Sequence, residues 1–462
     1  MRVCIIGSGY VGLTTGLCFA EMGHAVTFID KDPARIESLG RGVLPIYEPG
    51  LETSLAVGIA KGIVSFSTDT RDAAGDAAFD FAFICVGTPT IEGGWDADLA
   101  FVHAAARETA EALAPLEGFT VFVNKSTVPV GTARAVERIV GEVLPPERFA
   151  VASNPEFLRE GSAIKDFMNP DRIVVGASDE RARRHMEQLY KPLTRMGRPL
   201  VVTSTVETSE LIKYAANAFL ATKVAFINEL ARLCDAVGAD VEELSLGIGL
   251  DRRIGRDFLQ PGPGFGGSCF PKDTRALIST AQTHGSPVSI VERVVEANDV
   301  HKAAMVEAIT GGASVAGQRI AVLGLAFKAN TDDMREAASL TIVPALQAAG
   351  AEIVAYDPIA AEAAKPMLPG IAMAADVAGA VAGADLAVIL TEWPEFRHLS
   401  WGTLGATMRR ARVVDLRNVY TEAQIEGFGI DYVSLGRPLT GEAAADAAVR
   451  PGGDDPRRVA AE

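Results

Sequence analysis

Cysteine is scarce in this chain, with five residues in 462, an odd number, and no pair spaced Cys-x-x-Cys. This pattern excludes a disulfide framework and offers no zinc site, so we expect no bound metal and a reducing, cytoplasmic setting. Four of them, Cys4, Cys18, Cys85 and Cys234, fall in strand or helix patterns, where we expect buried, unreactive thiols. Only Cys269 stands in a glycine-rich, loop-like segment.

Basic residues are also in deficit, since 43 Lys and Arg face 59 Asp and Glu, for a net charge of −16. This balance excludes a general nucleic-acid binder, which concentrates cations to replace counterions. No uninterrupted apolar run approaches the roughly 18 residues of a membrane span, and the first residues lack the pattern of a secretory signal. With 48% hydrophobic residues, we expect a soluble protein of two or three domains.

The first 30 residues carry a dinucleotide-binding pattern. An apolar strand, Arg2–Ile6, runs into Gly7-Ser-Gly-Tyr-Val-Gly12, followed by a helical stretch and a second strand, Ala25–Asp30. In such a turn Gly7 allows the tight bend, Gly9 lets the backbone approach a pyrophosphate, and Gly12 lets helix and strand pack closely. The alternative is a glycine turn with no ligand.

Asp30 lies 18 residues after Gly12, at the end of the second strand. A carboxylate there can accept hydrogen bonds from the adenosine ribose and would repel a 2′-phosphate. The pattern therefore favours NAD over NADP, although the nearby Lys31 and Arg35 leave this preference open.

Two further apolar runs, Phe79–Val86 and Phe119–Lys125, lack polar alternation and are typical of buried parallel strands. Each leads into a polar turn that contains Thr88 or Thr127. Ligands of open α/β sheets gather at the carboxyl ends of the strands, so both threonines are cofactor or catalytic candidates. Alternatively, both cap helices.

The middle of the chain combines paired carboxylates with a long helix. Glu156 and Glu160 are four residues apart, on one helical turn or in a loop. The pattern Ser204–Glu207 is typical of a capping box, and it predicts a helix that continues without Gly or Pro to about Val237. Its length would be about 50 Å at 1.5 Å per residue. We interpret it as a spine between two domains.

Lys213 and Asn217 share one face of this helix within an apolar segment. Either they form a surface stripe, or they face a polar site in the interior. The presence of Cys269 downstream favours the site.

Cys269 lies in the decapeptide Gly264–Asp273, with Lys272 nearby and Asp273 expected to start a helix. Loop amides and cations lower the pKa of a thiol. A thiolate here could add to an aldehyde as a thiohemiacetal, become a thioester by hydride loss, and release an acid on hydrolysis. The segment predicts an oxidoreductase that oxidises an alcohol twice.

A second strand–helix–strand unit follows, with Arg319–Gly324, a helix over Ser339–Ala349 and Ala351–Asp357. Pro344 either kinks that helix or marks a later start. Because this unit lacks the three-glycine turn, it favours a mononucleotide whose phosphates meet Lys328.

Together these motifs resemble the UDP-glucose/GDP-mannose dehydrogenase family over residues 1 to about 437. The resemblance is carried by residues 7–12, 46–50, 125–129, 154–158, 213/217 and 264–273. It implies an α/β protein, with two Rossmann-like doubly wound domains joined by a long central helix and a helical dimerisation domain. The expected divisions are 1–203 for the NAD-binding domain, 204–310 for the central helix and catalytic loop, 311–440 for the UDP-sugar domain and 441–462 for a mobile tail.

The resemblance also implies an activity, the NAD-dependent, four-electron oxidation of UDP-glucose to UDP-glucuronate by a homodimer. Cys269 would be the nucleophile, with Lys213 and Asn217 stabilising the oxyanion. Thr127 and Asp273 would hold a catalytic water, and Glu156 would be the general base.

Binding roles follow from the same resemblance, and Gln260 departs from it because some members have lysine there. The expected NAD contacts are Gly7, Gly9, Tyr10, Val11, Gly12, Asp30, Arg35, Thr88, Thr127, Glu160, Lys272 and Arg335. The expected UDP-glucose contacts are Phe157, Leu158, Arg159, Glu160, Lys213, Asn217, Arg253 lent to a partner subunit, Phe258, Leu259, Gln260, Pro261, Gly262, Gly266 and Lys328.

Two alternatives stay open. A sibling enzyme would act on GDP-mannose or a UDP-N-acetylhexosamine, although Ser268–Asp273 resembles the glucose-specific form of the motif. A non-catalytic nucleotide-sugar sensor would keep the glycine turn and Lys328 without needing Cys269, Lys213 and Asp273 together.

Overall fold

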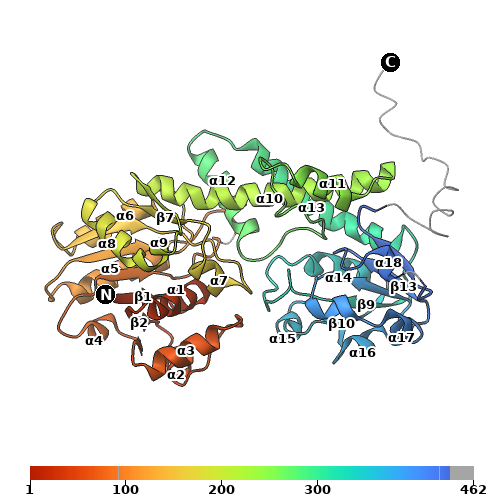
Figure 1. Cartoon of the computed structure of the whole chain (residues 1–462), viewed down its shortest axis with the longest axis horizontal. Helices are drawn as coiled ribbons and strands as arrows, with labels where there is room; N and C mark the ends of the chain where they lie inside the picture. Colours follow the sequence, from red (N-terminus) through yellow and green to blue (C-terminus); the bar gives the residue numbers. More distant parts are fainter. Residues whose placement is uncertain (92, 426, 438–462) are drawn as a thin grey trace, which may run out of the picture. The chain divides into compact units, whose positions relative to one another are not determined.

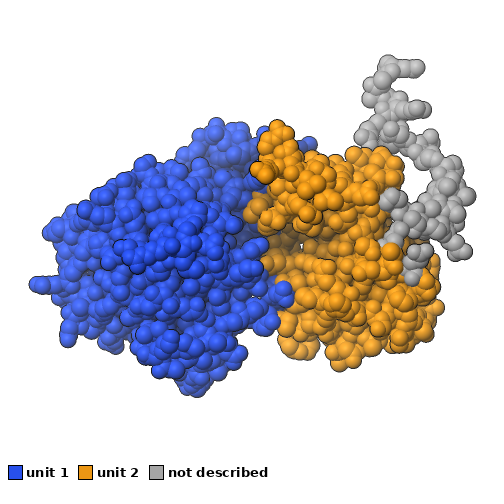
Figure 2. Space-filling view, in the orientation of Figure 1, with its two compact units in different colours: residues 1–219, 268–295, 330–332 blue, residues 220–267, 296–329, 333–462 orange. Residues whose placement is uncertain are grey.

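The computed structural model describes residues 1–91, 93–425 and 427–437, so the predicted tail at 441–462 lies outside the described residues (Figure 1). The chain forms two compact units, coloured separately in Figure 2. Unit 1 contains residues 1–219, 268–295 and 330–332, and unit 2 contains 220–267, 296–329 and the chain from 333 onward. The three predicted domain boundaries are not tested by this division and stay a prediction.

Unit 1 is built on an eight-stranded sheet in the order β3-β2-β1-β4-β5-β6-β7-β8. Its first six strands follow the Rossmann order and are parallel, while β7 pairs antiparallel with β6. The strands are β1 (Arg2–Ile6), β2 (Ala25–Ile29), β3 (Val64–Ser67), β4 (Phe81–Ile84), β5 (Thr120–Asn124), β6 (Phe149–Ser153), β7 (Ile173–Gly176) and β8 (Leu200–Thr203).

The absence of polar alternation in these strands follows from burial on both faces. In β1, Val3 and Ile5 pack into one hydrophobic cluster, whereas Cys4 and Ile6 pack into another. Because successive side chains point to opposite faces, helices must cover both sides of the sheet. The helices are α1 (Tyr10–Glu21), α2 (Pro33–Gly40), α3 (Leu51–Ala60), α4 (Thr70–Ala74), α5 (Ala100–Leu113), α6 (Thr132–Gly141), α7 (Ala163–Met168), α8 (Glu180–Leu189), α9 (Lys191–Arg195) and α12 (Phe270–Thr283).

Unit 2 repeats this topology with a parallel six-stranded sheet, β11-β10-β9-β12-β13-β14. The strands are β9 (Arg319–Leu323), β10 (Glu352–Tyr356), β11 (Ala372–Met373), β12 (Leu386–Ile389), β13 (Arg412–Asp415) and β14 (Asp431–Ser434). The helices are α11 (Val241–Gly249), α14 (Ser339–Ala348), α15 (Ala361–Ala364), α16 (Val377–Val381), the 3₁₀ helix η1 (Pro394–His398), α17 (Trp401–Gly405) and α18 (Glu422–Ile425). The predicted pair of Rossmann-like sheets is thus confirmed. Pro344 lies inside α14, so the later helix start is wrong.

Two helices, α10 (Val206–Val237) and α13 (Ser289–Thr310), contribute residues to both units. The long central helix is confirmed, but the predicted cap at Ser204 is wrong. The helix starts after Thr205, whose hydroxyl accepts a hydrogen bond from the backbone of Thr208 at 3.3 Å. Glu207, the expected partner in a capping box, pairs instead with Arg134 at 2.9 Å. None of the helices in the described part of the chain is long and apolar enough to cross a bilayer.

Candidate active site

The three glycines of the turn after β1 differ in the space that surrounds them. Gly7 has φ +96°, and a Cβ there would lie 2.9 Å from the carbonyl oxygen of Cys85. A Cβ on Gly12 would lie 1.9 Å from the oxygen of Gly7. Gly9, by contrast, would meet nothing within 4 Å. The open space over Gly9 leaves room for the predicted pyrophosphate at the start of α1.

A pocket of about 820 Å³ opens beside this turn, lined by Gly7, Gly9, Asp30 and Arg35 among others. Asp30 accepts hydrogen bonds from the backbone and hydroxyl of Ser8 at 2.8 and 2.6 Å, and from Arg35 at 3.3 Å. Burial opposes its ionisation, but these donors prevail and lower its pKa. The pocket is therefore lined by an ionised carboxylate, as the predicted contact of Asp30 with an adenosine ribose requires. Tyr10, in the first turn of α1, donates its hydroxyl to Glu48.

Thr88 and Thr127 meet at the carboxyl ends of β4 and β5. The hydroxyl of Thr88 donates to the backbone oxygen of Thr127 at 3.0 Å. Neither caps a helix, because Leu99 precedes α5 and Gly131 precedes α6. The capping alternative is therefore wrong, and both lie in the loops where ligands of such sheets bind.

Cys269 immediately precedes α12, and its carbonyl oxygen accepts from the backbone of Asp273 at 2.8 Å. The helix begins at Phe270, so the prediction that Asp273 starts it is wrong by three residues. Pro271 explains the early start, because a proline in the first helical turn lacks only a donor that would have no partner there.

Lys213 and Glu156 form a buried ion pair. The ammonium of Lys213 lies 2.8 Å from Glu156, with side chains 4% and 6% exposed. The second carboxylate oxygen of Glu156 accepts from the backbone of Leu158 at 2.6 Å. Burial opposes both charges, yet each partner favours the other, so the pKa of Glu156 is lowered and that of Lys213 raised. Of the two alternatives for Lys213, the surface stripe is wrong.

Asn217, one turn later on α10, is equally buried and donates to Asp273 at 2.6 Å. The other carboxylate oxygen of Asp273 accepts from Lys272 at 2.8 Å. Both proposed oxyanion-stabilising residues of α10 are therefore held by carboxylates. One of these carboxylates comes from the loop after β6 and the other from α12.

The thiol of Cys269 differs from the prediction. Burial raises its pKa, and the nearby Glu156 and Asp273 raise it further, while Lys213 and a contact with Ser268 oppose them. The expected lowering by cations and amides is thus wrong, because desolvation of the thiolate outweighs one buried ammonium. The other four cysteines are buried, as predicted.

The paired carboxylates Glu156 and Glu160 lie in the loop between β6 and α7 rather than on a helix. Glu160 accepts from Ser268 at 3.4 Å and from Thr331 at 3.2 Å. Of the neighbouring candidates, Phe157 lies under the guanidinium of Arg172, 3.6 Å from its ring centroid. Arg159 pairs with Asp166 at 2.7 Å and is 60% exposed.

Unit 2 holds the remaining candidates. Leu259, Pro261, Gly262 and Gly266 are buried, and Phe258 has an unusual positive φ of +63°. A Cβ on Gly266 would lie 2.3 Å from the oxygen of Glu336, so only glycine fits there. Three further candidates are solvent-exposed: Gln260; Arg253, paired with Asp251; and Arg335, paired with Asp333. Lys328 lies over the ring of Phe327, 5.6 Å from its centroid.

The second Rossmann-like unit differs from the first in the surroundings of the aspartate that follows its second strand. One oxygen of the buried Asp357 accepts from the backbones of Leu325 and Ala326, and from the indole of Trp393. The other accepts from the backbones of Ile359 and Ala360. Both oxygens of Asp30 also accept from the chain, but Asp30 lines the pocket beside the glycine turn, whereas Asp357 is only 3% exposed. The preference of unit 2 for a mononucleotide over a second dinucleotide stays a prediction.

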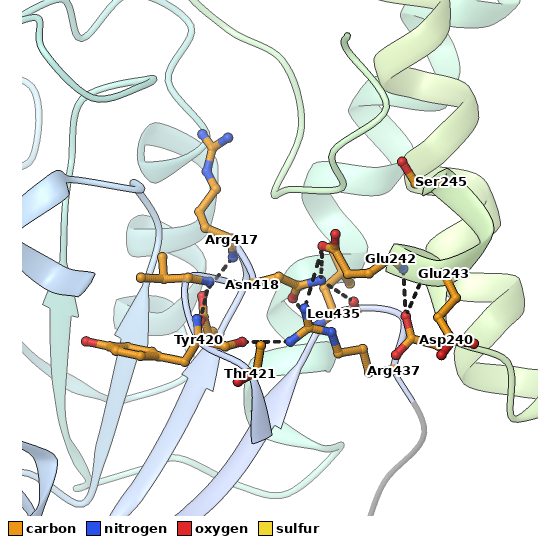
Figure 3. A network of polar contacts seen from close by, with 12 residues as sticks. Asp240, Glu242, Glu243, Ser245, Arg417, Asn418, Tyr420, Thr421, Leu435 and Arg437 are labelled. Carbon is orange, nitrogen blue, oxygen red and sulfur yellow. Dashed lines mark hydrogen bonds and ion pairs between the residues drawn. The ribbon is translucent and has the colours of Figure 1, made fainter. Parts of the chain in front are cut away.

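Sequence reasoning missed Arg417, which follows β13 at its carboxyl end (Figure 3). Its guanidinium donates to the backbone oxygens of Phe327 and Leu390 at 2.8 and 2.9 Å. It also lies against Gly262, where an added Cβ would be 3.1 Å away. Arg417 thus joins two candidate substrate segments, and its place after a parallel strand was the available signal.

Models of one family match the chain in three successive segments. They describe the NAD binding domain over residues 1–194, the central domain over 207–300 and the UDP binding domain over 321–422. The chain belongs to the UDP-glucose/GDP-mannose dehydrogenase family. The resemblance in the motifs and the predicted cofactor, NAD, are thereby confirmed.

Curated members of the family resemble the chain over nearly its whole length. The UDP-glucose 6-dehydrogenase of Rhizobium meliloti (strain 1021) is 52% identical over 95% of this chain and 100% of the relative. TuaD, the UDP-glucose 6-dehydrogenase of Bacillus subtilis, is 44% identical over 95% and 93%. Among solved structures, a UDP-glucose dehydrogenase from Pyrobaculum islandicum matches with a TM-score of 0.86 and 37% identity, covering 95% of this chain and 98% of that one.

The three family segments divide the candidate residues by chemistry. The NAD binding segment contains the glycine turn and Asp30, and the central segment contains Lys213 and Cys269. The UDP binding segment contains Lys328 and also Arg417. Arg417 therefore lies in the segment that matches the UDP binding domain of the UDP-glucose/GDP-mannose dehydrogenase family.

Proposed function

We propose that the chain is an NAD-dependent UDP-glucose 6-dehydrogenase, which oxidises the C6 alcohol of UDP-glucose twice to give UDP-glucuronate. The observation that carries this is the cluster that Cys269 forms with the buried pairs Lys213–Glu156 and Asn217–Asp273. A thiol, an ammonium, an amide and two carboxylates in one largely buried site suit covalent capture of an aldehyde. The full-length similarity to several UDP-glucose 6-dehydrogenases supports the same substrate.

NAD, held at the glycine turn and Asp30, would supply the hydride acceptor for the two oxidations at C6, and the proton of the C6 hydroxyl would be released to water. The residues of the chain stabilise the negative charge that accompanies these transfers. Lys213 and Asn217 donate hydrogen bonds to the oxygen on C6 as negative charge develops there. The sulfur of Cys269 adds to the C6 aldehyde and its proton passes to the aldehyde oxygen, which gives a thiohemiacetal. That carbon then gives up the second hydride and its hydroxyl proton is released to water, which leaves a thioester.

Hydrolysis of the thioester completes the reaction. Asp273 and Thr127 hold a water, Glu156 takes its proton, and the C–S bond breaks as the thiolate of Cys269 leaves. The lowered pKa of Glu156 keeps it ionised, which is the form a general base needs. The enclosed position of these groups retains the aldehyde between the two oxidations.

A homodimer fits the apolar surface of α10. Leu211, Phe219, Phe226 and Leu233 recur every seven or eight residues and are 45% to 66% exposed. This spacing places them on one side of the helix, as in a helix that packs against a second copy. Arg253, 88% exposed, is then available to a partner's site. We expect the dimer to act in the cytoplasm, where Cys269 stays reduced.

The test is the stoichiometry of NADH formed per UDP-glucose consumed by the purified protein. We expect a ratio of two, with UDP-glucuronate as product. A ratio of one would mean release of an aldehyde. GDP-mannose and UDP-N-acetylhexosamines form parallel arms, and preferential turnover of one of these would overturn the choice of substrate. Binding of UDP-glucose without any NADH formation would instead identify a sensor.

A further inference from the structure

The segment between α11 and α12 has no regular secondary structure, yet several of its backbone groups form hydrogen bonds with other parts of unit 2. Residues 259–267 are rich in glycine and proline, so few side chains of their own can hold them. Buried backbone groups need partners. In unit 2 side chains from α10, α11 and α13 supply several of these partners, and the backbone oxygen of Arg335 accepts from the N–H of Gly267 at 2.8 Å.

The peptide groups of Gly262 are held from two helices. Asn228 of α10 accepts from its N–H at 2.9 Å, and His301 of α13 contacts its carbonyl oxygen through Nε2 at 2.7 Å. Because a carbonyl oxygen only accepts, Nε2 must carry the proton of the ring. The two side chains are each 1% exposed.

Phe265 is held in the same way by one residue. Asn298 of α13 accepts from its N–H at 2.8 Å and donates to its carbonyl oxygen at 3.1 Å. Asn298 and His301 are three residues apart and therefore share a face of the helix. The hydroxyl of Ser245 on α11 adds a bond to the oxygen of Leu259 at 2.7 Å.

We propose that His301, Asn298 and Asn228 are positioning residues that set the conformation of the Gly262–Gly267 segment for binding the nucleotide sugar. This rests on the proposed function, because Gly262 and Gly266 are candidate contacts of UDP-glucose. Asn228, Asn298 and His301 touch neither substrate nor cofactor in this scheme. They act through the backbone that the segment presents to UDP-glucose.

His301 keeps its hydrogen bond to the carbonyl oxygen of Gly262 at neutral pH and well below it. Burial, opposed by the Gly262 contact and aided by the nearby Arg232, lowers its pKa to about 4. The ring is therefore neutral above that pH, so Nε2 remains a donor with an unprotonated Nδ1. The KM for UDP-glucose should not titrate with this residue between pH 5 and 9.

The experiment compares His301→Leu, which removes the donor, with His301→Gln, whose amide can replace Nε2–H. A matched control is His24→Leu, since His24 is also buried and contacts a backbone oxygen, that of Leu189, at 3.3 Å. We expect His301→Leu to raise the KM for UDP-glucose about tenfold, the worth of one buried hydrogen bond. His301→Gln and His24→Leu should stay within about twofold of wild type, with the KM for NAD unchanged throughout.

Hydrogen exchange of the peptide spanning residues 259–267, followed by mass spectrometry, reports on the segment without catalysis. Exchange should accelerate in His301→Leu and in Asn298→Asp, which loses the donor to Phe265, but not in His24→Leu. Unchanged exchange and unchanged KM in His301→Leu would overturn the positioning role. Equal loss of NAD and UDP-glucose affinity would also overturn it. Wild-type protein that fails to oxidise UDP-glucose would overturn the proposed function, while the exchange comparison still decides the role of His301.

Discussion

Lys213 Nζ and Glu156 Oε1 lie 2.8 Å apart in a site from which water is nearly excluded. The proposed oxyanion-stabilising cation and the proposed general base are therefore one buried ion pair before any substrate binds. Each charge offsets the desolvation of the other. Neither can be removed without leaving its partner buried and uncompensated, which couples catalysis to stability at this point.

Lys213→Ala should lower kcat strongly and destabilise the protein by about 3–5 kcal/mol, the usual cost of an orphaned buried charge. The double variant Lys213→Met, Glu156→Gln should recover much of that stability, because neutral groups of similar size fill the site. It should remain inactive. Urea denaturation and steady-state kinetics check both statements. A single variant with unchanged kcat would remove Lys213 from the mechanism.

The thiol of Cys269 should react with iodoacetamide at a rate that still rises with pH at pH 9. Its raised pKa means that the thiolate fraction increases with pH up to and beyond the ordinary cysteine value. Lys213→Met should slow alkylation several-fold and Glu156→Gln should accelerate it, since the two charges act on the sulfur in opposite directions. Rates measured from pH 6 to 10 with the label located by mass spectrometry test this. A plateau below pH 7 would contradict the raised pKa.

Cys269→Ser should abolish formation of UDP-glucuronate and leave NAD affinity within about twofold of wild type, because the thioester needs sulfur. A covalent or aldehyde-level species could then accumulate with UDP-glucose, detected by intact-mass measurement. The matched control is Cys234→Ala. Cys234 is buried and belongs to unit 2, whereas Cys269 belongs to unit 1. Normal glucuronate production by Cys269→Ser would refute the covalent route.

Asp30→Ser should shift the cofactor preference toward NADP, by about 10-fold or more in the ratio of kcat/KM values. The carboxylate now repels a 2′-phosphate and occupies Arg35 at 3.3 Å, so its removal frees that guanidinium. The gain should disappear when Arg35→Ala is added to Asp30→Ser. An unaltered preference in the single variant would show that other groups of the pocket select the cofactor.

Glu210→Gln should flatten part of the pH dependence of stability. Glu210 of α10 is buried and accepts from the backbones of Gly131 and Ala133 at 2.7 and 2.8 Å. Burial, against these two donors, raises its pKa to about 7. A raised carboxyl pKa favours folding fully below the unfolded value of about 4.3, and this contribution is lost as pH rises through about 7.

Wild type should therefore lose up to about 3 kcal/mol relative to Glu210→Gln between pH 4.5 and 7.5. Urea midpoints of the two proteins, measured in parallel across this range, isolate the contribution of Glu210 from all other groups. Parallel curves would contradict the prediction.

Local features of the fold could be predicted from the sequence. The glycine turn, Asp30 and the apolar runs at β1, β2, β4 and β5 are short-range patterns, since each depends on a backbone conformation or on burial of neighbouring residues. Element ends were less certain, as with Thr205 and Phe270, because a cap depends on which nearby hydroxyl or proline the chain can use. The family, fold class and cofactor predictions are confirmed, while the site roles stay predictions.

The sequence alone determined that this chain has two Rossmann-like nucleotide folds, a long helix and one cysteine in a glycine loop. Strand burial and glycine conformation depend mainly on residues that are adjacent in the chain. Only the tertiary structure decided that Glu156 neutralises Lys213, that Asp357 is held by backbone N–H groups and the Trp393 indole, and that burial raises the pKa of Cys269. It also decided that His301 and Asn298 hold a loop tens of residues away. Such outcomes depend on distances and desolvation between residues far apart in the chain, which no local pattern encodes.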